Sequence, residues 1–249
     1  MPWQARLAYV ALFAIAGAAW YVLAQAEHAM RDMQGDGVLM GLMWIMMAPR
    51  DISSYLTVTA AMWVIMMIAM MTPAVVPMML VFRGLERGPR AALDPVLFAG
   101  GYLASWSAVS LVAAAAQWWL HDNGSLHGPA LAAGRALSGG ILIAAGAWQW
   151  TPWKEACLSR CRGPLRFFLE HSRPGRAGAL VMGAHHGLYC IGCCWLLMLL
   201  MFAGGAMSVL TMAVLAAFIL LERVLPAGPW VTRIPGLALI ATGIILLAG

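Results

Sequence analysis

The chain has 249 residues, of which 63% are hydrophobic and 10% are charged, and its mean hydropathy is +0.81. Soluble globular proteins contain about 25% charged residues, so this composition excludes a soluble domain and predicts an integral membrane protein. The net charge of +5 does not indicate a nucleic-acid partner, because the basic residues lie between apolar stretches, where membrane topology accounts for them.

The first half of the chain predicts two spans with a long loop between them. Residues 7–25 form an apolar stretch that is long for a signal peptide, and we interpret it as a retained membrane anchor. Residues 27–54 are expected to form an outer loop with a short apolar helix, whose apolar core at 37–48 is too short to span a bilayer. The second span is expected at 56–82.

The second half continues the alternation of spans and loops. Segment 152–173 is expected to form a basic amphipathic helix on the cytosolic membrane surface, with Thr151 as its N-cap. The remaining five spans are expected at 95–120, 130–150, 178–203, 206–221 and 234–248.

The basic residues predict how the spans are oriented. With the N-terminus inside, twelve of the fifteen Lys and Arg residues fall in the predicted inner segments. Because Lys and Arg accumulate on the cytoplasmic side, this bias favours a cytosolic N-terminus and an outer C-terminus. We therefore expect one integral membrane domain over residues 1–249, an all-α transmembrane bundle of about seven spans in contact with the lipid bilayer.

Potential metal ligands concentrate in the uncharged run from 177 to 206. Wound as a helix, this run places an imidazole, three thiols and a thioether on one face, at the i, i+4, i+7 and i+8 spacing. Soft metals such as Cu(I) prefer this ligand set, and zinc accepts its nitrogen and thiolate subset. The candidate ligands are His185, His186, Cys190, Cys193, Cys194 and Met201.

Packing is the alternative interpretation of the same face. Cysteine behaves as a small hydrophobic residue and methionine fills gaps between helices, so either residue type alone is compatible with a plain core. Histidine is harder to explain in this way, because an imidazole inside a bilayer needs a polar partner or a pathway.

A methionine stripe in the second span gives a second set of soft ligands. Met66 and Met70 follow the i, i+4 spacing of one helix face, and counting residues places them and Cys190–Cys194 near mid-membrane. The two helices can therefore meet and form a dry pocket of thiolate, thioether and imidazole groups. The alternative is that flexible side chains fill the interior of a bundle.

Two further groups have open interpretations. Cys157 and Cys161 either share a metal or present an apolar face to the membrane. The outer methionines near His28 either load metal or anchor the chain at the interface. Because five cysteines cannot all pair within one chain, and none is predicted in an outer loop, we expect reduced thiols or metal ligands.

Three blocks of the sequence resemble a known family. They are the Met-rich block 61–73, the block 148–161 that ends in Cys157 and Cys161, and the block 187–195 with its Tyr-Cys-x-Gly-Cys-Cys-Trp pattern. In these blocks the chain resembles a bacterial family of predicted metal-binding integral membrane proteins, described as domain of unknown function 2182. The resemblance implies a metal-binding protein of the bacterial inner (cytoplasmic) membrane and assigns no catalytic residue.

These observations favour a copper-binding membrane protein that transports the metal or delivers it to a partner, with zinc as the second choice. A membrane thiol-disulfide oxidoreductase using Cys190 and Cys193 is an alternative. Others are a haem-binding or assembly subunit, with His185 or His186 as the axial ligand, and a purely structural subunit. The chain has no Ser/His/Asp arrangement, phosphate loop or carboxylate pair, so we expect a binding protein rather than a hydrolase or ATPase.

Overall fold

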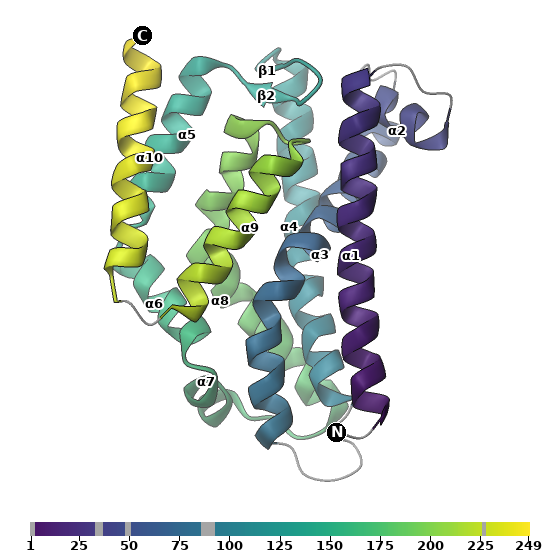
Figure 1. Ribbon diagram of the computed structural model, residues 1–249, viewed down its shortest axis with the longest axis vertical. Coiled ribbons are helices and arrows are strands. Elements are labelled where there is room, and N and C mark those ends of the chain that lie inside the picture. Colours follow the sequence, from purple (N-terminus) through teal and green to yellow (C-terminus); the bar gives the residue numbers. More distant parts are fainter. Residues whose placement is uncertain (1–2, 33–36, 48–50, 86–92, 226–227) are drawn as a thin grey trace.

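The protein is built almost entirely of helices. The computed structural model describes residues 3–32, 37–47, 51–85, 93–225 and 228–249. The helices in these ranges are α1 Trp3–Asp32, α2 Val38–Met47, α3 Ile52–Leu85, α4 Asp94–Asp122, α5 Arg135–Trp148, α6 Pro152–Arg162, α7 Pro164–His171, α8 Gly175–Gly204, α9 Val209–Val224 and α10 Trp230–Ala248 (Figure 1). The expected all-α class is confirmed, with one small addition: an antiparallel pair of two-residue strands, β1 Leu126–His127 and β2 Ala132–Ala133.

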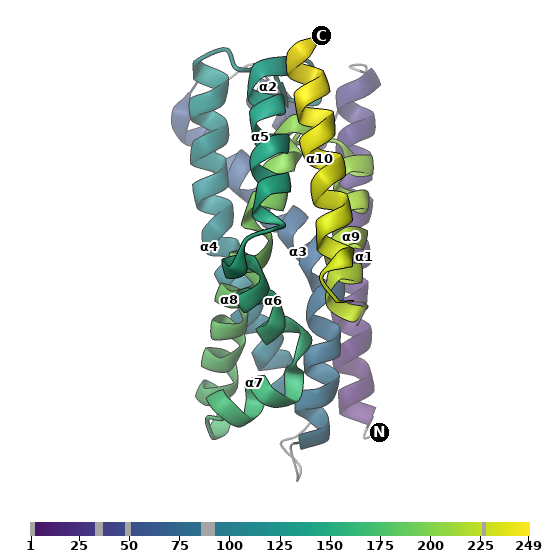
Figure 2. The same cartoon turned by 90° about the vertical axis from the view of Figure 1, so that its left-hand side faces the viewer.

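The helices form one elongated bundle. The start of α1 and the end of α10 lie at opposite ends of it (Figures 1 and 2). The end with α2, the strand pair and the end of α10 is called the α2 end here, and the opposite one the α7 end. Helices α3, α4, α8 and α9 supply most of a continuous buried core, which contains both the methionine stripe and the cysteines.

Five helices are long and apolar enough to cross a membrane. They correspond to the spans expected at 7–25, 56–82, 95–120, 178–203 and 234–248. The other two expected spans coincide with α5 and α9, which have only 14 and 16 residues. The count of seven spans and the orientation therefore stay predictions, and Arg50, Arg87 and Arg90, three of the charges behind that orientation, lie outside the described residues.

The segment expected to be one surface helix over 152–173 is instead two helices. Thr151 caps α6 by accepting a hydrogen bond from the Lys154 backbone N–H, as expected. Gly163 then leaves the helical conformation, and Pro164 begins α7. Both helices bury side chains against the bundle, Lys154, Leu158 and Cys161 from α6 and Phe167 and Phe168 from α7. Trp153 of α6 and Leu165 and Leu169 of α7 stay exposed, so the expected position on the membrane surface stays a prediction.

Helices α4 and α8 approach each other closely through glycine. A Cβ atom on Gly101 of α4 would lie 2.0 Å from the Leu180 carbonyl oxygen of α8. A Cβ atom on Gly183 of α8 would lie 1.9 Å from the Phe98 carbonyl oxygen of α4. Small residues at such crossings let two membrane helices pack backbone to backbone, and here they fix α8 against α4.

Neighbouring glycines of α4 provide a matched test of this packing. We expect Gly101→Ala to lower the free energy of unfolding by about 1–3 kcal/mol or more, because backbone atoms must move apart. Gly100→Ala has nothing within 4 Å of the new methyl group and should be neutral or slightly stabilising. Thermal unfolding of both variants in detergent checks this, and equal midpoints would contradict it.

Candidate metal centre

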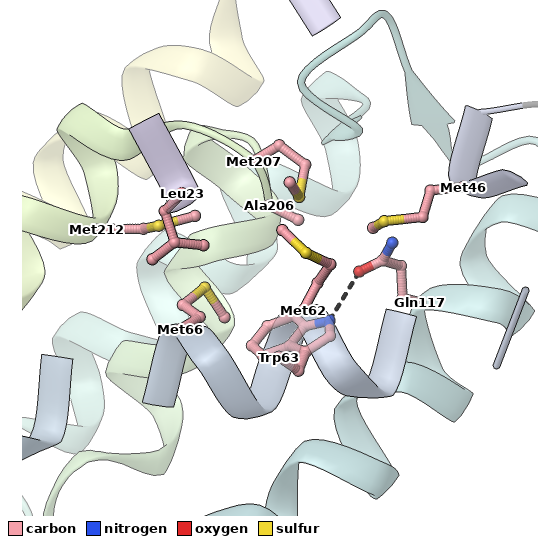
Figure 3. A pocket seen from close by; sticks show the side chains of 9 residues that line it. All are labelled: Leu23, Met46, Met62, Trp63, Met66, Gln117, Ala206, Met207 and Met212. Carbon is pink, nitrogen blue, oxygen red and sulfur yellow. Dashed lines mark hydrogen bonds between the residues drawn. The ribbon is translucent and has the colours of Figure 1, made fainter. Parts of the chain in front are cut away.

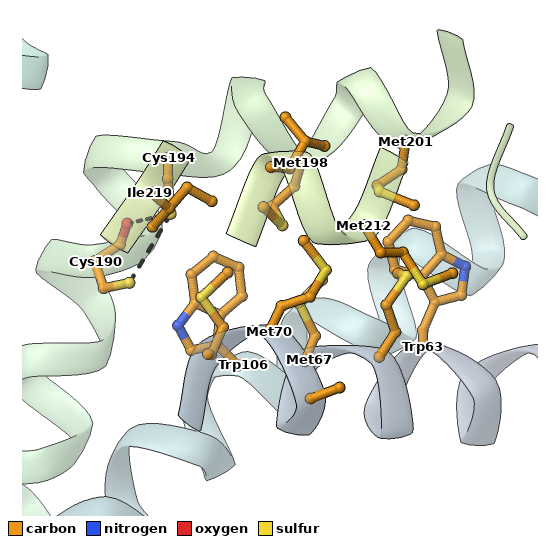
Figure 4. Close-up of a cluster of buried hydrophobic side chains, with 14 of the residues drawn as sticks. Trp63, Met67, Met70, Trp106, Cys190, Cys194, Met198, Met201, Met212 and Ile219 are labelled. Atoms are coloured by element: carbon orange, nitrogen blue, oxygen red, sulfur yellow. Dashed lines mark hydrogen bonds between the residues drawn. The ribbon is translucent and has the colours of Figure 1, made fainter. Parts of the chain in front are cut away.

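Three cysteines of α8 bring their sulfur atoms together in the middle of the bundle. The Sγ atoms of Cys190, Cys193 and Cys194 all lie within 4.8 Å of one another, and the Cys190 and Cys194 sulfurs are 3.9 Å apart (Figure 4). The Cys193 and Cys194 thiols both donate to the Cys190 carbonyl oxygen, at 3.1 and 2.9 Å, which turns them toward Cys190. All three are at most 1% exposed.

The spacing of these sulfurs suits one soft metal ion. An ion about 2.3 Å from three sulfurs in a plane holds those sulfurs roughly 4.0 Å apart. The Cys190–Cys194 separation is already close to this value, so the side chains need little movement to bind. A set of thiols without oxygen ligands favours Cu(I) over hard cations.

Helix α6 adds two more thiols next to this cluster. Cys161 is buried beside Cys193, and contact with Cys193 together with burial raises the pKa of the Cys161 thiol well above its usual value. Cys157 is half-buried and packs on α8, where its Sγ lies 2.7 Å from the position of a Cβ on Gly192. The i, i+4 pair on α6 therefore faces α8 and not the membrane.

A buried arginine contacts the cluster directly. One terminal nitrogen of Arg223, near the end of α9, contacts Cys190 Sγ. The other donates to the Ala74 carbonyl oxygen at 3.1 Å and to the Tyr102 hydroxyl at 3.4 Å. The Tyr102 hydroxyl in turn lies 3.0 Å from Cys190 Sγ. No carboxylate pairs with Arg223 among the described residues, so the cysteine sulfurs are the nearest groups that can carry its counter-charge.

A buried ion pair holds α6 beside the cysteines. Lys154 Nζ donates to both carboxylate oxygens of Glu222, each at 2.8 Å, and both side chains are 1% exposed. Arg162 Nε also donates to the Glu222 backbone oxygen at 2.7 Å. Glu222 therefore joins both ends of α6 to α9, immediately before Arg223.

The methionine stripe meets the cysteine helix inside the core. Met66, Met70 and Met201 are all at most 2% exposed. The Tyr102 hydroxyl contacts Met71 Sδ of α3 at 3.7 Å as well as Cys190, and the Trp63 ring of α3 packs on Phe202 of α8, with 5.5 Å between ring centroids. In Figure 4, Met67 and Met70 point toward Met198, beyond which Cys190 and Cys194 lie. The two helices thus share one sulfur-rich interior.

The two histidines are placed apart from the cysteine sulfurs. His186 is fully buried among the rings of Phe98, Tyr102 and Phe167, at centroid distances of 5.3–5.7 Å, and neither ring nitrogen has a hydrogen-bond partner among the described residues. His185 is half-buried and faces His171 of α7, with 5.9 Å between the rings. Neither joins the group of three thiols.

The contact between α6 and α8 joins two segments that the sequence placed at different depths. We expected α6 at the membrane surface and Cys190–Cys194 at mid-membrane, yet Cys157 of α6 packs on Gly192. Helix α8 has 30 residues, about 45 Å, whereas the hydrocarbon layer is about 30 Å thick. The start of α6 lines the same cavity as the start of α10, the shortest of the five long helices. The start of α6 therefore lies beside the start of α10, and the depth of the cluster in the membrane stays a prediction.

Comparison with known families agrees with this chemistry. The sequence model of the PpoB2 family, described as a copper chaperone, matches residues 60–246. The chain belongs to the PpoB2 copper chaperone family. The matched range contains α4 and α8, most of α3 and every cysteine. No curated protein and no solved structure matches the chain.

Membership of the PpoB2 family supports the expected relation to a metal-binding family, and copper as the metal. The name given to the resemblance, domain of unknown function 2182, stays a prediction. Together with the three clustered thiols, the family indicates that this protein handles copper.

Proposed function

We propose that this protein carries Cu(I) on the thiolates of Cys190, Cys193 and Cys194 and delivers it to a partner protein. The observation behind this proposal is the set of three buried sulfurs within 4.8 Å, at a separation that suits one soft ion. Cu(I) displaces the thiol protons when it binds, so each bond to sulfur releases one proton and loading weakens as the pH falls. Cys161 lies outside this group of three, and as a buried thiol of α6, which packs on α8, it is the candidate fourth ligand.

The buried arginine supports a charged cargo site. Three thiolates with one Cu(I) carry a net charge of about −2, and a buried anion is costly without a counter-charge. Arg223 provides that counter-charge at Cys190. The buried cluster with Arg223 beside it therefore suits a metal–thiolate complex better than the packing of neutral thiols, which needs no counter-charge.

The other function classes fit these contacts less well. A thiol-disulfide oxidoreductase must present a thiol to its protein substrate, but the three clustered cysteines are at most 1% exposed. Haem ligation by His186 requires the rings of Phe98, Tyr102 and Phe167 to move away from it. Zinc on Cys161 and the three clustered cysteines is the second candidate, because four thiolates form a closed structural zinc site.

We assign delivery to the side on which α6 covers the cluster, because Cys157 of α6 packs on Gly192 of α8. Cys193 lies next to α6, whose Trp153 and Glu155 are exposed and whose Glu155 lines a cavity with the start of α10. A partner that docks there needs to reach through only one short helix. We therefore assign the partner to that side.

Competition with a Cu(I)-selective chelator tests the cargo site. We expect the purified protein to bind Cu(I) tightly and the Cys190→Ser, Cys193→Ser, Cys194→Ser triple variant to bind it at least a hundredfold more weakly. Cys157→Ser is the matched control, because Cys157 lies outside the three-thiol group and should keep near-wild-type affinity. Wild-type affinity in the triple variant, or zinc in place of copper at equal loading, would overturn the proposal.

A further inference from the structure

Five methionines surround a small cavity between the cysteine cluster and the α2 end. They come from four segments: Met46 of α2, Met62 and Met66 of α3, Met207 before α9 and Met212 within it. Each is at most 6% exposed, and Figure 3 shows their side chains converging on one space. The cavity measures about 10 Å³, which is room for roughly one water-sized sphere or one ion.

The lining is soft and almost free of polar groups. Among the described residues of the lining, only Trp63 and Gln117 carry hydrogen-bonding side-chain groups, and these groups are already paired. Gln117 Oε1 accepts a hydrogen bond from Trp63 Nε1 at 2.8 Å, and Gln117 Nε2 donates to the Tyr55 hydroxyl at 3.3 Å. Among the described residues, no carboxylate or imidazole lines the space. A water there lacks the polar partners it needs, whereas thioethers bind Cu(I) and Ag(I) and reject hard cations.

Neighbouring side chains connect this cavity with both the surface and the cysteines. Met207 also lines a larger cavity of about 120 Å³, together with Glu27, Met30 and the well-exposed Arg31. On the other side, Met212 and Trp63 lie in the same row of buried side chains as Met198, Cys194 and Cys190 (Figure 4). Thioether sulfurs therefore follow one another from the α2 end to the thiols.

We propose that Met46, Met62, Met66, Met207 and Met212 form a second Cu(I) site, made of thioethers only, that loads the cysteine cluster from the α2 end. This site deepens the proposed function and rests on copper as the cargo. A thioether has no proton to lose, so binding at this site is independent of pH, in contrast to binding by thiols. Metal that arrives at the weaker neutral site can then pass to the stronger thiolates.

Silver stoichiometry tests the second site, because Ag(I) imitates Cu(I) without redox chemistry. The full-length protein in detergent is loaded with Ag(I), freed of excess metal and analysed for silver. We expect about two silver ions in the wild type and one in the Cys190/Cys193/Cys194 triple-serine variant. That last ion should persist at mildly acidic pH, where the thiol site of the wild type weakens.

The methionine variant separates the two sites. Met62→Leu, Met66→Leu and Met212→Leu conserve volume, so the fold should be retained while the thioethers are lost. This variant should keep one silver ion, which is bound by the cysteine thiolates and is therefore lost at mildly acidic pH. Met78→Leu, Met79→Leu and Met182→Leu, which change buried methionines outside the cavity, form the control and should bind two ions.

The outcomes distinguish failure of either proposal. No silver in the triple-serine variant, or two ions in the Met62/Met66/Met212 variant, would overturn the thioether site and leave the cysteine site standing. One acid-stable ion in the wild type that the cysteine changes do not affect would instead overturn the cysteine site.

Discussion

Replacing Arg223 with methionine is expected to lower the Cu(I) affinity about ten- to a thousandfold while leaving the metal-free protein at least as stable. The guanidinium contacts Cys190 Sγ and is the only cation in contact with the cluster among the described residues. At about 4 Å and an effective dielectric constant of about 20, removing it withdraws up to roughly 4 kcal/mol from an anionic complex. Without metal, the same change removes a buried charge that has no carboxylate partner.

A lower Cu(I) affinity together with an equal or higher stability of the metal-free protein distinguishes a counter-charge from a structural role. Cu(I) competition and thermal unfolding of the metal-free protein are measured on Arg223→Met and on Arg223→Lys. The lysine variant keeps the charge but loses the forked contacts to Ala74 and Tyr102. Its Cu(I) affinity should therefore lie between that of the wild type and that of Arg223→Met. If Arg223→Met unfolds the metal-free protein, or binds copper as tightly as the wild type, Arg223 is not the counter-charge.

Breaking the buried pair of Lys154 and Glu222 is expected to have the largest effect on stability. Glu222→Gln leaves the ammonium group of Lys154 buried without its charged partner and should lower the free energy of unfolding by about 3–5 kcal/mol. Because this pair joins α6 to α9, the loss should also expose Cys157 and Cys161 to thiol labelling.

The double variant is the control for this prediction. Lys154→Met combined with Glu222→Leu replaces both charges with apolar groups of similar size, and we expect most of the lost stability to return. Thermal unfolding of the Lys154→Met and Glu222→Leu single variants and of the double variant completes the cycle. Additive losses would show that the two side chains do not act as a pair.

Most of the helices were predictable from the sequence, and so were two sulfur-rich faces that could meet, although their contact was not. Long apolar runs fix the five long helices because only a helix satisfies its own backbone in a membrane. The i, i+4 spacing of Met66 and Met70, and of Cys190 and Cys194, placed each pair on one face. The structure then brought the two faces into a shared core.

The groups that complete the site were not predictable, because they are set by tertiary packing. Arg223 and Lys154 follow apolar stretches, and such charges are usually in loops, yet here both are buried. The adjacent acidic Glu222 at the end of an apolar span was the available signal that a charge pair turns inward. Tyr102 offered no such signal, since its role depends on the close approach of α4 to α8 at Gly101.

The histidines show the limit of counting residues along a helix. Consecutive residues point about 100° apart, so His185 and His186 cannot share one face. His186 does follow the face of Cys190, but it is one turn away and is covered by aromatic rings. Whether it takes part in metal binding stays a prediction, whereas His185 lies on the side of α7.

X-ray absorption at the copper edge tests the central claim most directly. The protein is loaded with less than one equivalent of Cu(I) under reducing conditions, and the first shell of the metal is measured. We predict a shell of sulfur alone, and we predict that its thiolate distances are lost when Cys190, Cys193 and Cys194 are serine. A first shell that contains nitrogen or oxygen, or one that survives the cysteine changes with sulfur at unaltered distances, would contradict the account.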